Sequence, residues 1–299
     1  SVGASFPTSF MPWLSRDGIA PTIASMLYNT LFTYEDQTGE FLELIGKEWY
    51  YVDQDGQPIL TPEGQIDYDR LEQIYEDDDF QYLVVKIIIH DDVFWHDGEQ
   101  LTVEDIYYSY DIGTNNQLSN HAGALAWTAD LQHKYSNGIL INQGIFTYDH
   151  GANERGYAID ESEKDTVMYL RVNKVLGAIT SLFSTILIIP EHIWAPIVTP
   201  ENQLNSKDPT ADSLAQYQNP VGSGPYRLDI DHSNAQVITL TRYDDYHLTD
   251  EDEDYLYNVE RIKFLLFQEQ NVAIYALLKG HIDVLDSTIS SKYMSLFEN

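Results

Sequence analysis

The chain has no cysteine, few basic residues and no long apolar run. Of its 299 residues, 16 are Lys or Arg and 48 are Asp or Glu, which gives a formal net charge of −32 at pH 7. The absence of cysteine excludes disulfides, thiolate zinc sites and a cysteine nucleophile. A surface of this charge repels nucleic acid and anionic lipid, so we expect no nucleic-acid partner. No apolar stretch approaches the length that spans a bilayer.

The remaining bulk properties are those of a globular protein. The hydrophobic fraction is 43%, and a chain of this length can bury more than one core. Solubility or adaptation to salt explains the acidic balance better than a charge-specific function does. The chain opens at Ser1-Val2-Gly3 without a basic or apolar leader segment. We therefore expect that a signal peptide either never existed or has been removed.

One stretch organises the rest of the chain. Residues 94–110 read FWHDGEQLTVEDIYYSY and predict a strand end, a tight turn and a helix. Asp97-Gly98 is a turn pair, because glycine adopts positive φ at little cost. Thr102 is a good N-cap, and Asp105 three residues later forms a shortened capping box. The preceding run over 82–89, YLVVKIII, has the β-branched composition of a buried strand.

Two later segments contain proline or glycine at informative positions. Residues 182–194 predict a strand that stops at Pro190, and this proline opens a helical turn. Residues 219–228, NPVGSGPYRL, predict a glycine-rich kink before a strand. A phosphate loop would need a Gly-Lys-Ser/Thr ending and a following helix, so this segment is not one.

The last predicted unit is a helix over 271–279 with strands on either side. Asn271 is a plausible N-cap and Gly280 a plausible C′ residue. The strand before the helix covers 259–267, and another strand is expected to start at 282–284.

The sequence supports no catalytic or metal site. His90 and His96 have Asp91, Asp92 and Asp97 nearby, but their spacing matches no standard ligand set. Carboxylates are too numerous for a glycosidase pair to be identified by spacing, and no serine lies in a G-x-S-x-G elbow. We therefore predict no catalytic residue, no metal and no cofactor. A secreted hydrolase with unrecognised carboxylates remains the alternative from another class.

Several of these segments resemble, in order, the motifs of the family 5 extracellular solute-binding proteins. These proteins are the oligopeptide- and dipeptide-binding components of ABC importers. The segments 94–110, 188–194, 219–226 and 276–283 resemble the family's W-H-D-G-x-x-L-T-x-E-D-x-x-Y-S-Y, I-I-P-K-H-I-W, N-P-V-G-T-G-P-Y and A-L-L-x-G-x-I-D motifs. Glu191 replaces the lysine of the second motif. The family usually continues well past this length, so we expect the N-terminal part of a longer protein.

The resemblance implies a mixed α and β (α/β) fold, the first lobe of a type II periplasmic-binding-protein-like fold with the second lobe absent. Residues 1–33 and 165–299 would form a discontinuous subdomain, and 34–164 an inserted family-specific subdomain. The implied function is to capture a short peptide outside the cytoplasm and deliver it, as a monomer, to an ABC permease in the membrane. The location would be the periplasm or the cell surface, with any lipid anchor upstream of Ser1. The protein would not be an enzyme.

The resemblance also suggests ligand-binding residues. Asp17-Gly18-Ile19 resembles the first-lobe segment that enters the cleft, where a carboxylate can pair with an ammonium group. Trp127 would supply an apolar wall, and Asp283 and Asp286 lie where the family's chain passes the cleft. Surface charge or core packing explains each of these residues at least as well.

The ligand itself stays open at this point. The family is broad, so nickel, heme, a sugar or a signal peptide is the alternative to a short peptide. In this family much of the ligand is held by the lobe that is missing here. The segment alone is therefore expected to bind peptide weakly or not at all.

Overall fold

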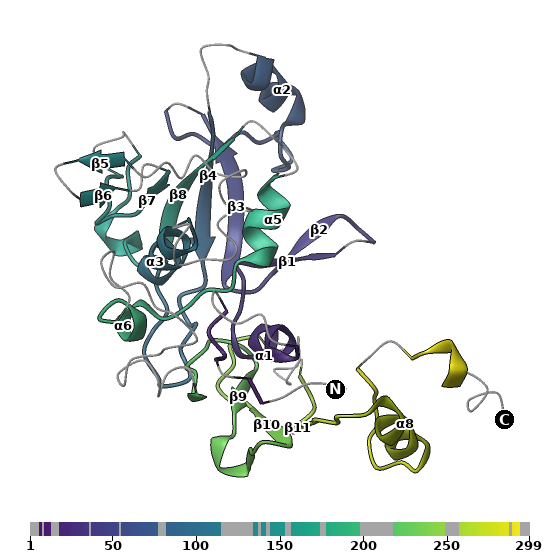
Figure 1. Cartoon of the computed structure of the whole chain (residues 1–299). Helices are drawn as coiled ribbons and strands as arrows, with labels where there is room; N and C mark the ends of the chain where they lie inside the picture. The colour runs from purple at the N-terminus through teal and green to yellow at the C-terminus, as the bar shows by residue number, and fades with distance from the viewer. Residues whose placement is uncertain are drawn as a thin grey trace.

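The structure of the chain is a computed structural model, and Figure 1 shows how its helices and strands are arranged. No helix among the described residues is both long and apolar enough to cross a bilayer. The structure describes residues 6–7, 9–12, 18–35, 37–53, 55–76, 82–114, 134–136, 139–141, 144–152, 157–173, 178–197, 218–248, 257–286 and 289–293.

The larger sheet is built around the strand that the sequence predicts. This strand is β4, and it covers the predicted residues Tyr82–Ile89. Every second side chain from Leu83 to Ile89 is buried, and those between them are half-buried. The sheet has four antiparallel strands in the order β3-β4-β8-β7. The other strands are β3 (Gly46–Val52), β8 (Val167–Asn173) and β7 (Ile145–Phe146).

This sheet crosses the subdomain boundary that the sequence suggests at residue 165. Strand β8 pairs with β4 from Val167 opposite Ile88 to Asn173 opposite Tyr82. β8, which the predicted division assigns to 165–299, therefore pairs with a strand of the 34–164 segment. The division itself remains a prediction.

Two helices pack on the larger sheet, and one of them corrects a prediction (Figure 1). The helix α3 (Val103–Thr114) follows the predicted turn. The helix α5 (Ala178–Thr185) contains residues 182–185, where a strand was expected. A short apolar run suits a buried helix as well as a buried strand. Here the ring of Phe183 lies 5.2–5.5 Å from the rings of Phe32, Phe41 and Trp49, so tertiary packing selects the helix.

The smaller sheet contains the strand after the glycine-rich kink. Its three antiparallel strands have the order β11-β10-β9, and α1 (Ala20–Leu27) packs beside β9. The strands are β9 (Tyr226–Leu228), β10 (Val237–Arg242) and β11 (Arg261–Leu265).

The C-terminal helix agrees with the prediction at one end only. The helix α8 (Gln270–Leu278) is followed by Gly280, whose φ of +68° suits the predicted C′ position. Its N-cap is Glu269, so the prediction of Asn271 is wrong by two residues. Residues 282–284 form no strand, because they make no ladder with any described segment.

The remaining elements are short. One of them is the predicted helical turn, which is confirmed as α6 (Glu191–Trp194) with Pro190 as its N-cap. The others are the hairpin β1 (Phe32–Glu35) and β2 (Glu40–Glu43), α2 (Tyr68–Glu76), the hairpin β5 (Lys134–Ser136) and β6 (Ile139–Ile141), and the 3-10 turns η2 (Glu161–Glu163) and η3 (Ile230–His232).

One hydrophobic core joins the two sheets. It contains Ile87 from β4, Ile106 from α3, Leu27 from α1 and Ile238 from β10, each fully buried. Since these residues belong to one cluster, the two sheets and their helices are packed against each other.

Candidate functional site

The turn that follows Phe94 is fixed by the glycine-rich segment 126 residues later in the chain. The main-chain N–H of His96 donates to Gly222 O at 2.8 Å. The ring Nδ1 accepts from the Gly222 N–H at 3.2 Å, and the ring Nε2 lies 2.9 Å from Gly224 O. The sequence suggests only that His96 orders its own turn. The structure shows that it also joins two distant segments.

The two glycines of this segment lie directly on the end of α1. The Gly224 N–H donates to Leu27 O at 2.8 Å. A Cβ on Gly222 would overlap that same carbonyl oxygen, and a Cβ on Gly224 would meet Met26 O and Leu27 C. Asn29 Nδ2 also donates to Ser223 O at 3.1 Å. The glycine-rich kink is therefore a close backbone contact, as a glycine at a packed strand start suggests. We call residues 95–98, 222–225 and 27–29 together the His96 joint.

The carboxylate of Asp105 caps two helices at once. Its Oδ2 accepts from the Thr102 N–H at 2.9 Å, and its Oδ1 accepts from the Glu191 N–H at 2.8 Å. The Glu104 N–H donates to Thr102 Oγ1 at 3.3 Å. The predicted shortened capping box is confirmed, and the same side chain also holds the start of α6. Burial raises the pKa of Asp105, and the two main-chain donors oppose that shift.

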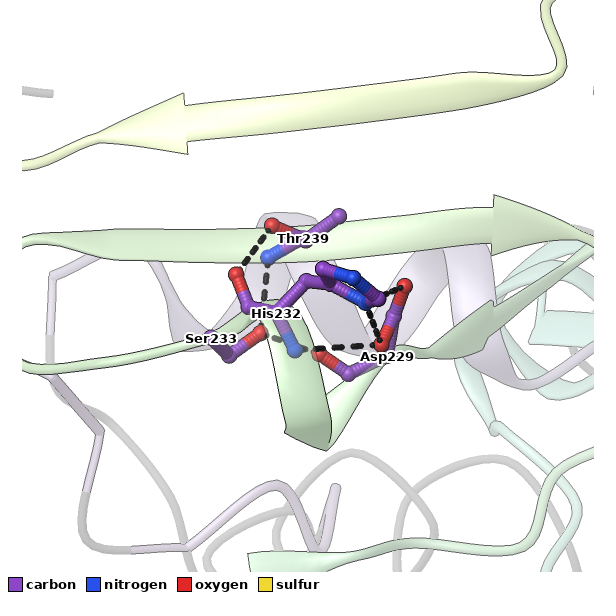
Figure 2. Close-up of polar contacts among 4 residues, drawn as sticks. All are labelled: Asp229, His232, Ser233 and Thr239. Carbon is purple, nitrogen blue, oxygen red and sulfur yellow. Dashed lines mark hydrogen bonds and ion pairs between the residues drawn. The ribbon is translucent and has the colours of Figure 1, made fainter.

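Figure 2 shows a group that resembles a hydrolase triad in composition but not in geometry. The ring Nδ1 of His232 lies 2.9 Å from both carboxylate oxygens of Asp229. The hydroxyl of Ser233 donates to Asp229 O and accepts from the Thr239 N–H, and Thr239 Oγ1 donates to His232 O. A triad needs the serine hydroxyl on the second ring nitrogen. This hydroxyl instead serves main-chain groups, so the cluster caps the turn between β9 and β10.

An open groove of about 630 Å³ lies along β11 at the C-terminal end. All five residues of β11 line one wall, with Val259 and Phe267 at its ends. Residues within 281–286 line the other wall, including Asp283 and Asp286. Both of these carboxylates are exposed. The volume is within the usual range of ligand pockets.

The outer edge of β11 offers main-chain groups to this groove. Within the described residues, β11 has a strand neighbour on one side only, β10. The Leu266 N–H donates to Gln236 O, and Glu260 O accepts from the Arg242 N–H. Even-numbered residues therefore face β10, so Arg261 and Lys263 turn their main-chain groups outward. Arg261 and Lys263 were not among the predicted ligand residues. Their spacing of two residues on the predicted strand before the helix could have indicated that both lie on the same side of that strand.

Of the four predicted ligand residues that the structure describes, two lie together. Asp283 and Asp286 share the groove, whereas Gly18 and Ile19 are not among its lining residues. Gly18 is exposed with φ +42°, and Ile19 is the N-cap of α1 with 2% of its surface exposed. Asp17 and Trp127 lie outside the described residues. Whether these residues contact ligand remains a prediction.

The histidines and acidic residues of the described ranges include no group of three or more that could hold a metal. His90 instead has its Nε2 at 2.9 Å from a carboxylate oxygen of Glu43.

Three solved structures show the fold. The oligopeptide-binding protein OppA of Haemophilus influenzae, in complex with RPPGFSPFR, matches 99% of this chain with 47% of its own length, at 17% identity and TM-score 0.62. MoaA of A. tumefacien R10, in complex with mannopinic acid, matches 99% of this chain with 45% of its length, at 16% identity and TM-score 0.63. NikZ of Campylobacter jejuni, in complex with Ni(L-His), matches 97% of this chain with 43% of its own length, at 16% identity and TM-score 0.58.

The chain therefore spans less than half the length of each of these structures. The expected periplasmic-binding-protein fold is confirmed. No curated protein matches the chain. The model of the bacterial extracellular solute-binding proteins, family 5 Middle, matches residues 75–299. Because this match covers well over half of the chain, the protein belongs to the family 5 bacterial extracellular solute-binding proteins.

Proposed function

We propose that the protein captures a short peptide outside the cytoplasm and delivers it to an ABC import permease. The observation that carries the proposal is the family match over residues 75–299. Among the similar structures, OppA of Haemophilus influenzae is bound to the peptide RPPGFSPFR. The relatives with mannopinic acid and Ni(L-His) make an opine and a nickel complex the alternative ligands. The proposed carrier acts as a monomer.

The groove along β11 is the part of the described chain that suits an extended peptide. A peptide main chain can add to the outward-facing groups of Arg261 and Lys263 as another strand, which gives affinity without sequence selectivity. The carboxylates of Asp283 and Asp286 lie on the opposite wall. There they can pair with the ammonium end of the ligand. Asp17, Gly18, Ile19 and Trp127 remain further predicted contacts.

Native mass spectrometry with a mixture of short peptides tests the function. The 299-residue chain and the complete gene product are measured in parallel. We expect the complete product to retain unmodified peptides with defined stoichiometry. Cleaved peptides would support a hydrolase instead. Retention of Ni(L-His) or mannopinic acid in place of peptide would keep the carrier and replace its ligand.

A charge-neutral variant tests the groove. In the complete gene product, D283N together with D286N should weaken peptide binding by about twofold to thirtyfold, because each of the two exposed ion pairs contributes about 0.2–1 kcal/mol. The matched control is D69N on α2, an equally exposed carboxylate outside the groove. Titration calorimetry at low and high salt measures both. Equal affinities for the double variant and the control would remove these residues from the site.

A further inference from the structure

The His96 ring is held in one protonation state by the two groups that it contacts. The Gly222 N–H can only donate, so ring Nδ1 must accept from it. Gly224 O can only accept, so ring Nε2 must carry the proton. The bonds therefore require a neutral imidazole with its proton on Nε2. A protonated ring would place a second N–H directly against the Gly222 N–H.

The charged groups around the ring do not favour its protonation. Arg227 of β9 disfavours a positive ring, and Asp97 of its own turn favours one more weakly. Tyr243, which follows β10, places its ring 4.9 Å from the imidazole in an edge arrangement. From α1, the groups that face the joint are the main-chain carbonyls of Met26 and Leu27. Burial is the largest effect, and it lowers the pKa of His96 to about 4.

The ring packs directly against the glycine to which it is bonded. Gly222 is pressed between Leu27 O and the ring, and a Cβ added there would lie 3.3 Å from the ring Cε1 of His96. The Gly224 N–H is at the same time bonded to Leu27 O. Loss of the bond between the ring and Gly222 therefore acts on the 222–225 turn, which carries the start of β9 and the contact with α1.

We propose that His96 is an acid-sensitive tie between the 95–98 turn, which precedes α3, and the 222–225 turn, which precedes β9. At pH values above the range in which His96 gains a proton, the neutral ring holds the His96 joint closed. Protonation breaks the Nδ1 bond and separates the two turns. A family whose members act outside the cytoplasm meets external pH directly, so the joint would respond to acid around the cell. This inference is independent of which ligand the protein carries.

The pH range follows from the two protonation equilibria. In the unfolded chain the pKa of a histidine is about 6.5, above the value near 4 in the folded protein. Below about pH 6.5 the unfolded chain binds more protons at this residue, so folded stability falls as the pH falls towards 4. The unfolding equilibrium constant should rise by up to tenfold per pH unit across this window, and about 300-fold in total, through His96 alone.

The direct test uses the unmodified chain. Nitrogen-15 NMR of the His96 ring should show the neutral form with the proton on Nε2 down to about pH 4. The exchange protection of the Gly222 amide, corrected for intrinsic rate, should fall between pH 6.5 and 4 more steeply than that of Gly39, whose amide bonds Glu35 O in the β1-β2 hairpin and opens without freeing His96. Titration of the ring near pH 6.5, the other tautomer, or parallel protection of the two amides would overturn the proposal.

A variant isolates the histidine from the many acidic groups. H96Q keeps one acceptor and one donor in the side chain but does not titrate. The difference in unfolding free energy between the unmodified chain and H96Q should change with pH between 6.5 and 4 and be constant above 7. The control H281Q replaces an exposed histidine outside the joint and should leave the pH profile unchanged. A constant difference for H96Q throughout would contradict the tie, and the NMR test stands even if H96Q does not fold.

Discussion

The His96 joint and the C-terminal end of the chain are built in opposite ways. In the joint, Trp95 is fully buried and the main chains of 222–225 and 27–29 are in direct contact. At the C-terminal end, Val284 is 78% exposed, and α8 lies to one side of the two sheets in Figure 1. Three exposed apolar side chains follow helical spacing on α8, namely Val272, Tyr275 and Leu278.

The motifs that carry the family resemblance are mainly structural in this chain. The W-H-D-G and N-P-V-G-S-G-P-Y segments meet each other in the joint, and the I-I-P-E-H-I-W segment is tied to α3 through Asp105. The candidate ligand groove lies instead at the exposed end, between a strand that no motif marks and residues 281–286, of which 281–283 end the A-L-L-x-G-x-I-D motif. In this chain the His96 joint holds the fold and includes none of the residues that line the groove.

The largest effect is expected from a methyl group at the centre of the joint. G222A should destabilise the protein by about 3 kcal/mol or more, since its Cβ overlaps a main-chain carbonyl that cannot rotate away. The control G56A has open space and φ +74°, so it should cost only about 1–2 kcal/mol for its left-handed backbone. Chemical denaturation measures the unfolding free energy of both variants. Equal losses would mean that the joint is not close-packed.

The next largest effect is expected where Asp105 caps two helices. D105A should cost about 2–3 kcal/mol, because two main-chain donors, of Thr102 and Glu191, lose their acceptor. D97A removes an exposed carboxylate that is bonded to the Glu99 N–H and the His192 ring, and it should cost below about 1 kcal/mol. If D97A proves the more damaging change in thermal unfolding, the assignment of the shared cap is wrong.

The smallest effect is expected on the outer face of α8. V272A should change stability by less than about 0.5 kcal/mol, because Val272 is 52% exposed. I274A, two residues along the same helix, removes a fully buried side chain and should cost about 2–4 kcal/mol. Thermal unfolding of both variants separates the faces. A large loss for V272A would show that this face is covered in solution.

Local patterns in the sequence predicted several elements correctly. The β-branched run over 82–89 is β4, and Thr102 with Asp105 marks the start of α3. Pro190 begins α6, and Gly280 follows α8 with positive φ. Each of these features depends on neighbouring residues, namely composition, capping or backbone freedom, so a short window contains the needed information.

The predictions that failed concern segments whose structure depends on residues far away in the sequence. Residues 182–185 are helical because Phe183 fits among rings from β1, β2 and β3. The predicted strand at 282–284 makes no ladder with a described segment, since a strand requires a neighbour as well as a suitable composition. For the candidate site, the sequence suggested Asp283 and Asp286 but not the groove wall from β11, because that wall exists only once β11 becomes the end of its sheet.

The sequence by itself therefore determined the family, the chain order of its main elements and the chemistry of its turns and caps. Only the tertiary structure decided that the His96 ring bonds both glycines 126 and 128 residues later, that β8 joins β4, and that two carboxylates face a strand edge across a groove. The reason is physical: caps and turns act within a few residues, whereas hydrogen bonds between distant segments and the protonation state of a partly buried ring depend on how the whole chain packs.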